Sequence, residues 1–291
     1  MNNPEQFYKK VIDQELGPGL VLKSHRGIGG GCIHNGVRLI LDKGSYFLKW
    51  NDTIDLDMFE KEALGLEFLR KISVINIPEV IGTGTINGTA YLLMNFIESA
   101  PRAESYWEDF GSKLAQLHQK SNEYFGLDHN NYIGSLPQEN NFNSNWVEFF
   151  IHSRLDVMLT RASKNGLVDS ALIKKFEQLY VKLPSLILSE KPSLLHGDLW
   201  SGNVLVGMDG LVSLIDPAVY FGHREVELAF TGLFGGFDRR FYQAYEDSFS
   251  LQPGYDDRFE IYNLYPLLVH LNLFGSAYMS GIKSTLSKFI V

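Results

Sequence analysis

The chain has 291 residues and a net charge of −8, and its hydrophobic content of 45% is ordinary for a globular protein of one large domain or two lobes. The acidic balance argues against nucleic acid or an anionic membrane as the main partner, and it leaves neutral or cationic substrates open. Because Cys32 is the single cysteine, no intramolecular disulfide forms. With no signal-peptide core or membrane-spanning run in view, we expect a cytoplasmic protein.

The first hundred residues are predicted to be rich in β-structure. Residues 4–16 have the pattern of a short helix that ends at Gly17-Pro18-Gly19. Residues 20–96 then follow the order strand, strand, helix, strand, strand, with the helix at 58–72. The strands indicated by alternating apolar and polar residues are 37–41, 46–50, 80–86 and 90–96, the last two joined by the hairpin-forming pair Asn87-Gly88.

After about residue 97 the pattern becomes mostly helical. The helices expected there are 110–121, 146–163, 170–188 and a set that begins near Glu225. A short β pair, 204–206 with 212–215, interrupts them. We therefore predict a first lobe at residues 1–96 and a second lobe at residues 97–291.

One segment carries most of the chemistry: Leu194 to Leu205 reads LLHGDLWSGNVL, and a further carboxylate follows at Asp216. Phosphoryl transfer needs a carboxylate that orients the attacking hydroxyl and takes its proton, a role that the spacing gives to Asp198. Mg²⁺ prefers hard oxygen ligands, which Asn203 and Asp216 offer from the two flanking strands. The alternative is a tight turn beside a capping carboxylate, but the full pattern favours an ATP- and Mg²⁺-dependent catalytic loop.

Two upstream segments are candidates for binding ATP. The glycine run Gly29-Gly30-Gly31 precedes the first hairpin, and glycines let backbone N–H groups approach phosphate closely. This run departs from the protein-kinase pattern G-x-G-x-x-G. The segment Met94-Asn95-Phe96 falls where an adenine would meet the link between the lobes.

Lys49, at the end of a predicted strand, is the candidate cation for the α- and β-phosphates. Such a lysine is held by a carboxylate from the following helix, where Glu60 and Glu62 both occur. We favour Glu62 because it lies three and four residues from Phe59 and Leu66 and so shares their side of the helix.

These residues resemble the fructosamine kinase (ketosamine-3-kinase) family, which is related to the aminoglycoside phosphotransferases. The most specific similarities are His-Gly-Asp-Leu-Trp-Ser-Gly-Asn at 196–203, Asp-Pro-Ala at 216–218 and the run 220–225. Further similar segments are spread over nearly the whole chain, at 29–33, 58–63, 114–118, 125–128 and 131–134, and at the single residues Trp146, Phe149, Phe150 and Arg154. The resemblance implies an α+β, bilobal, protein-kinase-like fold with a small β-rich N-lobe and a larger, mostly helical C-lobe.

The resemblance also implies an activity, the ATP-dependent phosphorylation of the 3-hydroxyl of a ketosamine, a sugar adduct on a free or protein-bound amine. In the family the product is unstable and releases the amine, so the reaction promotes deglycation. We expect ribulosamines or erythrulosamines to be preferred to fructosamines, and the protein to be a monomer or weak dimer. By position, Trp200 is a candidate wall of the sugar site. Four residues, His223, Arg224, Glu225 and Glu227, either line or brace the substrate side, unless the two glutamates only favour a helix N-terminus.

Other interpretations fit less well. A protein kinase has an arginine where this chain has Gly197, and little room follows Asp216 for an activation segment. A related kinase acting on an aminoglycoside, choline or homoserine remains the alternative enzyme, and a regulatory pseudokinase is disfavoured because Lys49 and Asp198 are present. Cys32, in the glycine-rich loop, is either a redox-sensitive thiol or a small apolar filler.

Overall fold

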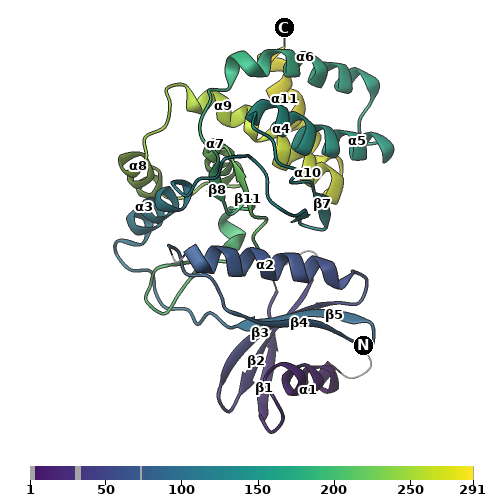
Figure 1. Ribbon diagram of the computed structural model, residues 1–291, viewed down its shortest axis with the longest axis vertical. Coiled ribbons are helices and arrows are strands. Elements are labelled where there is room, and N and C mark those ends of the chain that lie inside the picture. The colour runs from purple at the N-terminus through teal and green to yellow at the C-terminus, as the bar shows by residue number, and fades with distance from the viewer. Residues whose placement is uncertain (1–3, 30–33, 73, 291) are drawn as a thin grey trace. The chain divides into compact units, whose positions relative to one another are not determined.

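The computed structural model describes residues 4–29, 34–72 and 74–290, and the chain forms two compact units (Figure 1). The first unit comprises Met1–Tyr106 together with Gly202–Pro217, and the second comprises Trp107–Ser201 together with Ala218–Val291. The chain therefore returns to the first unit for a short segment, whereas the predicted second lobe contained all of 97–291.

The first unit is built on a five-stranded antiparallel sheet in the order β1-β2-β3-β5-β4. Its strands are β1 (Leu22–Gly27), β2 (Asn35–Leu41), β3 (Gly44–Asn51), β4 (Val80–Ile86) and β5 (Thr89–Asn95). The predicted hairpins are confirmed, and the Asn87 turn residue has the positive φ of 52° that such turns require. The sheet has one strand more than predicted, because β1 adds an exposed edge beside β2.

Two helices, α1 (Pro4–Glu15) and α2 (Leu56–Ile72), cover opposite faces of this sheet (Figure 1). Successive side chains of a strand point to opposite faces. In β3, Leu48 joins the apolar cluster that includes Val11 of α1, whereas Lys49 bonds to Glu62 of α2. The alternation thus places a buried cation on the α2 face of the sheet.

The returning segment forms the hairpin β9 (Val204–Val206) and β10 (Val212–Leu214). The Asn76 side chain donates to Ser213 Oγ at 2.7 Å, and the Asn76 carbonyl accepts the Leu214 N–H at 2.9 Å. Ala103 N–H donates to the Gly210 carbonyl at 3.0 Å. These bonds tie the hairpin to the first unit and explain why it belongs there.

The second unit is mostly helical and has its own core, which includes Trp146, Phe150, Phe176 and Leu268. Its helices are α3 (Tyr106–His118), α4 (Trp146–Phe150), the π-helix η1 (Ile151–Leu155), α5 (Asp156–Lys164), α6 (Ser170–Leu186), α7 (Arg224–Leu233), α8 (Arg239–Ser248), α9 (Tyr255–Tyr262), α10 (Leu264–Phe274), the 3₁₀ turn η3 (Ser276–Tyr278) and α11 (Met279–Phe289). The strand pairs β6 (Asn131–Ile133) with β7 (Leu136–Gln138) and β8 (Ser193–Leu195) with β11 (Tyr220–Gly222) were not predicted. With three residues each, these strands leave little periodic signal, although the equally short pair β9 and β10 was predicted.

The predicted helix over 146–163 is confirmed in extent but contains an irregularity. Asn145 caps its start by accepting the Glu148 N–H, and the π-turn of η1 then shifts the register. That turn places Arg154, which is fully buried, with its guanidinium 4.1 Å from the centre of the Tyr220 ring.

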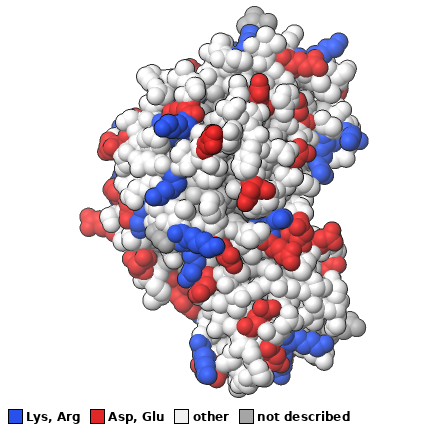
Figure 2. All heavy atoms as spheres, viewed as in Figure 1, with Lys and Arg blue, Asp and Glu red and all other residues white. Residues whose placement is uncertain are grey.

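No helix in the described part of the chain is long and apolar enough to cross a membrane. On the face drawn in Figure 2, acidic and basic side chains are interspersed among neutral ones.

Candidate active site

The first unit contributes an ion-pair cluster. Lys49 Nζ donates to Glu62 Oε1 at 2.7 Å and to Asp216 Oδ1 at 2.6 Å. Lys49 is 6% exposed, so its ammonium exchanges most of its water for these two carboxylates. Glu60, the other candidate partner, is exposed on the outer side of α2. The structure therefore brings together Lys49, Glu62 and Asp216, three of the predicted site residues.

The electrostatics of this cluster follow from one cation lying between two anions. Burial alone would lower the pKa of Lys49, but Asp216 and Glu62 together raise it, so the ammonium stays charged. Burial raises the pKa of Glu62, against the effect of Lys49 and together with that of Asp216. Burial, and then the Lys49 charge, lowers the pKa of the neighbouring His34 to about 4, which keeps that ring neutral. With both carboxylates ionised the cluster carries one net negative charge.

Asp216 and Asn203 offer oxygen donors suited to a divalent cation. The Asp216 side chain is 37% exposed, so it is accessible although it pairs with Lys49. Its backbone has a φ of 56°, a left-handed conformation that non-glycine residues adopt mainly where function or context demands it. The Asn203 carbonyl accepts the Ile215 N–H at 3.1 Å, which holds Asn203 beside the residue that precedes Asp216. Carboxylate and amide oxygens beside an uncompensated negative charge fit Mg²⁺.

The predicted phosphate loop is described only in part, because Gly30, Gly31 and Cys32 lie outside the described residues. Gly29 has open space where a side chain would begin, and Ile28 N–H donates to the Gly36 carbonyl at 2.9 Å. That bond joins the two sides of the loop at its base.

The predicted adenine-contacting segment ends strand β5. Met94 is buried, and the N–H groups of Asn95 and Phe96 already donate to the carbonyls of Glu79 and Ser45, at 2.9 and 3.1 Å. An adenine bound here therefore has to form its hydrogen bonds with carbonyl groups of this segment or with the residues that follow it.

The second unit contributes Asp198, three residues after the end of β8 on a tight turn. Gly197 has a φ of 86°, and a Cβ built on it would lie 2.0 Å from the Ala218 carbonyl oxygen. The Ala218 N–H in turn donates to the His196 carbonyl at 2.9 Å. Only glycine can adopt this conformation and allow this close approach. The fold therefore requires glycine at position 197, which the motif alone did not reveal.

The turn is anchored by a buried carboxylate from helix α7. Glu227 accepts the backbone N–H of Gly197 at 2.6 Å and of His196 at 3.1 Å. It also accepts from His118 Nε2 at 2.9 Å, while Nδ1 of the same ring bonds to the Tyr245 hydroxyl at 2.8 Å. Burial would raise the pKa of Glu227, but the His118 hydrogen bond, the nearby histidines and the Gly197 N–H lower it overall. An ionised Glu227 thus fixes the backbone immediately before Asp198.

A pocket opens beside Asp198 within the second unit. The other residues around it include Leu195, Tyr220, Phe230, Tyr265 and His270, and its described lining contains no lysine or arginine. The Tyr265 hydroxyl donates to Gln138 Oε1 at 2.7 Å, so one aromatic wall is fixed by a buried amide. Trp200 lies edge-on to Phe234, with ring centres 6.3 Å apart. The sequence offered no pattern that marked Tyr265 or His270, since both lie on a helix whose buried face is otherwise apolar.

His223, Arg224 and Glu225 are all buried at the start of α7, and their polar atoms are engaged within the protein. Arg224 donates to both oxygens of Glu190, at 2.8 and 2.9 Å, and to the carbonyls of Phe249 and Ser250. Glu225 receives two bonds from Arg258, at 2.7 and 2.6 Å. The three residues join α7 to the segment before β8 and to the segment between α8 and α9.

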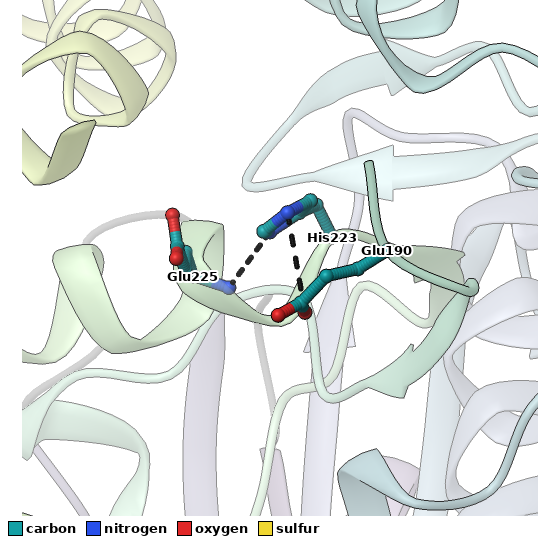
Figure 3. A group of neighbouring side chains, drawn as sticks. All are labelled: Glu190, His223 and Glu225. Carbon is teal, nitrogen blue, oxygen red and sulfur yellow. Dashed lines mark hydrogen bonds and ion pairs between the residues drawn. The ribbon is translucent and has the colours of Figure 1, made fainter. Parts of the chain in front are cut away.

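Figure 3 shows that Glu190, His223 and Glu225 also approach one another as three potential metal ligands. His223 Nδ1 accepts from the Glu225 N–H at 3.3 Å, and Nε2 donates to the Leu188 carbonyl at 3.2 Å. Burial lowers the pKa of His223, so the ring is neutral with both nitrogens occupied. The carboxylates already have guanidinium partners. The cluster is a buried ion-pair network, and we assign no metal to it.

The fold and these groups define a protein-kinase-like phosphotransferase. A crystal structure of a thermostable mutant of an aminoglycoside phosphotransferase, in a ternary complex with AMP-PNP and hygromycin B, matches with a TM-score of 0.66 at 15% identity, covering 96% of this chain and 97% of that one. At that identity the similarity concerns the fold alone.

The family is more specific: the model of the fructosamine kinase family matches residues 4–291, and the chain belongs to that family. A protein of Lactiplantibacillus plantarum described as a probable ketoamine kinase is 38% identical over 264 residues, 90% of this chain and 92% of its own. The chloroplastic protein-ribulosamine 3-kinase of Arabidopsis thaliana is 37% identical over 268 residues, 90% and 81% of the two chains. The crystal structure of a Thermobifida fusca protein assigned as a fructosamine-3-kinase matches with a TM-score of 0.86 at 32% identity over 96% of both chains.

Proposed function

We propose that this protein is an ATP-dependent kinase that phosphorylates the 3-hydroxyl of ketosamines, with ribulosamines or erythrulosamines preferred to fructosamines. The observation that carries the proposal is the position of Asp198, on an anchored turn in a pocket whose described lining is aromatic, apolar and acidic. Such a lining suits a small polyol that bears a cationic amine. The ketosamine activities of the family and of the named relatives support the choice of substrate.

In this proposal Asp198 accepts a hydrogen bond from the sugar hydroxyl and takes its proton as the oxygen attacks the γ-phosphoryl group. Glu227 keeps the Asp198 turn fixed, so little conformational entropy of the turn is lost when the substrate binds. Asn203 and Asp216 hold Mg²⁺, which supplies charge neutralisation at the phosphates when it is bound. Lys49, oriented by Glu62, contacts the α- and β-phosphates.

The nucleotide is bound by the glycine run at 29–31 and by the end of β5. Since the Asn95 and Phe96 N–H groups are engaged, we assign the hydrogen bonds to adenine to backbone carbonyls of Met94, Asn95 and Phe96 and to the N–H of Ile97, and the Met94 side chain to the apolar contact. Phe96 stacks with Arg38 at 4.2 Å, which fixes the segment.

On the substrate side, we assign the sugar wall to Trp200 and a bracing role to His223, Arg224 and Glu225. Bracing follows from their burial and from the internal partners of their polar atoms. Release of the amine from an unstable phosphorylated product, and hence deglycation in the cytoplasm, completes the proposal. Redox sensitivity of Cys32 stays a prediction from the sequence.

The test is release of ADP in the presence of Mg²⁺ with three acceptors in parallel: ribulosyl-lysine, fructosyl-lysine and an aminoglycoside. We expect the fastest release with ribulosyl-lysine, a loss of at least about 10³-fold in Asp198→Asn, and no release after chelation of the metal. Release with the aminoglycoside alone would assign the protein to the aminoglycoside kinases and refute the proposal.

A further inference from the structure

Helices α3 and α8 lie side by side in the second unit and approach each other closely at Gly111 (Figure 1). A Cβ built on Gly111 of α3 would lie 2.2 Å from the carbonyl oxygen of Phe241 in α8, so a side chain there would force the helices apart. His118 follows Gly111 by about two helical turns and therefore lies on the same side of α3. Its ring centre is 5.5 Å from that of Tyr245 in α8.

The hydrogen bonds of His118 have a defined direction. Nε2 lies 2.9 Å from Glu227 Oε2, and an ionised carboxylate only accepts, so Nε2 carries a proton. Nδ1 lies 2.8 Å from the buried hydroxyl of Tyr245, which has no other acceptor in the described part of the chain. Burying that hydroxyl without an acceptor would be costly, so it donates to Nδ1. The donors therefore point from Tyr245 through His118 to Glu227.

This relay, formed by Tyr245, His118 and Glu227, ends at the turn that carries Asp198. The two oxygens of Glu227 accept from His118 Nε2 at 2.9 Å and from two backbone N–H groups of the turn, at 3.1 and 2.6 Å. The bond from His118 thus fixes the plane of the carboxylate that holds the turn. Each member of the relay is at most 2% exposed, and successive hydrogen bonds strengthen one another where water is excluded.

The start of the relay is held by helix α7. Arg224 donates to the carbonyls of Phe249 and Ser250, at 2.6 and 2.7 Å, where α8 ends. The Phe249 N–H in turn donates to the Tyr245 carbonyl at 2.8 Å. Arg224 therefore fixes the last turn of α8, which places the Tyr245 ring against His118.

Packing alone does not account for the hydroxyl at position 245. A phenylalanine would fill the same space against His118 without burying a polar group. Tyr242, on the same helix, offers a contrast, because its hydroxyl bonds to Thr231 Oγ1 of α7 at 3.1 Å and so supports local structure. The Tyr245 hydroxyl instead bonds to the one side chain that orients Glu227 in the described structure.

We propose that Tyr245 and His118 are positioning residues that act on Asp198 through Glu227. By fixing the Glu227 carboxylate, the relay keeps the Asp198 turn in the orientation that phosphoryl transfer needs. Its loss therefore lowers kcat and leaves substrate binding nearly unchanged. The inference rests on the proposed function, in which Asp198 acts on the sugar hydroxyl, and it adds two residues that are not among those lining the pocket beside Asp198.

The experiment measures kcat and the KM values for ATP and ribulosyl-lysine in Tyr245→Phe, with Tyr242→Phe as the matched control. Tyr245→Phe removes only the hydroxyl, so kcat should fall about three- to tenfold, the size of one neutral hydrogen bond, with both KM values within about twofold. Tyr242→Phe loses a comparable bond on the same helix and should keep kcat within about twofold. His118→Leu should lower kcat at least about tenfold, and His118→Gln, which keeps a donor toward Glu227, should recover part of that loss.

A double-variant cycle tests whether the effect passes through Glu227. If it does, Tyr245→Phe changes kcat less than about twofold in a Glu227→Gln background, which has already lost part of the connection to the turn. Equal fold-changes in both backgrounds, an unchanged kcat in Tyr245→Phe, or equal losses in Tyr245→Phe and Tyr242→Phe would overturn the relay and leave the kinase proposal standing. Absence of wild-type turnover with every acceptor would overturn the proposed function and the relay with it. Thermal unfolding checks each variant, and if His118→Leu is unfolded the comparison rests on Tyr245→Phe and His118→Gln.

Discussion

Lys49 Nζ and Asp216 Oδ1 lie 2.6 Å apart, although 167 positions separate the two residues in the sequence. The contact forms because the hairpin β9–β10 belongs to the same compact unit as strand β3. Asp216 therefore has two assigned tasks, to orient the lysine and to offer an oxygen to Mg²⁺. Glu62 shares the first task, which leaves Asp216 able to serve the second.

This division predicts different results for the two glutamates of α2. Glu62→Gln removes the carboxylate that holds Lys49, so kcat/KM for ATP should fall about 10- to 100-fold. Glu60→Gln is the matched control, because Glu60 is exposed on the same helix and should leave kcat/KM within twofold. Steady-state kinetics with varied ATP measure both. Equal effects of the two substitutions would refute the assignment of Glu62.

The turn before Asp198 predicts a strong sensitivity at Gly197. In Gly197→Ala the new Cβ meets the Ala218 carbonyl and the residue stays at positive φ, so the free energy of unfolding should fall by about 3 kcal/mol or more. Gly166→Ala is the control, since Gly166 has a φ of 70° but open space around it, and should cost about 1 kcal/mol. Urea unfolding of the two variants separates the cost of positive φ, which both have, from the cost of the Ala218 contact, which only Gly197→Ala has. Similar losses of unfolding free energy would show that the Ala218 carbonyl moves aside without cost.

Much of the fold follows from local pattern, and the reason lies in element length. Helix α2 and the hairpins at Asn87 and at 42–45 were predicted because each spans enough residues for its periodicity to show. Strands β8 and β11 have three residues each and form only because chain segments far apart in sequence pair. The return of 202–217 to the first unit depends on long-range bonds such as that from Asn76, which no local pattern encodes.

The candidate site likewise contains residues that the sequence predicted and one whose role it did not. Asp198, Asn203 and Asp216 were proposed because their spacing matches a chemical requirement. Glu227 was expected either to line or brace the substrate side or to favour a helix N-terminus. Its role in the Asp198 turn was not predicted, because its partners are backbone N–H groups 30 and 31 positions earlier in the chain. Residues that act through tertiary contacts leave no motif in a single sequence.

Glu227 should behave as a positioning residue. Glu227→Gln keeps the size of the side chain but offers one acceptor oxygen where the carboxylate offers two, so the Asp198 turn loses part of its support. We expect kcat to fall about tenfold or more, with KM for ATP within about twofold. Glu148→Gln, an exposed glutamate at the start of α4, is the control. A change confined to KM for ATP would contradict this role.

The ionisation of Glu227 also predicts an acid dependence of stability. Its pKa is lowered in the folded state from the ordinary value of 4.5, so its contribution is complete above about pH 4.5 and is lost as the pH falls through the folded pKa. The Tm of the wild type should exceed that of Glu227→Gln at pH 6, and the difference should shrink below pH 4.5. Thermal unfolding between pH 6 and pH 3 measures this difference in Tm. A difference that grows on acidification would contradict a lowered pKa of Glu227 in the folded state.

The pair Glu225–Arg258 tests whether the start of α7 braces the site or contacts substrate. Arg258→Met leaves Glu225 buried without its cation, so the free energy of unfolding should fall by about 3 kcal/mol or more. Adding Glu225→Gln removes the stranded charge and should restore more than half of that loss. If the pair only braces the start of α7, the double variant recovers the wild-type KM for the ketosamine as it recovers stability. A double variant that is stable but has KM raised more than tenfold would place Glu225 in contact with substrate, because stability and binding would then have separate causes.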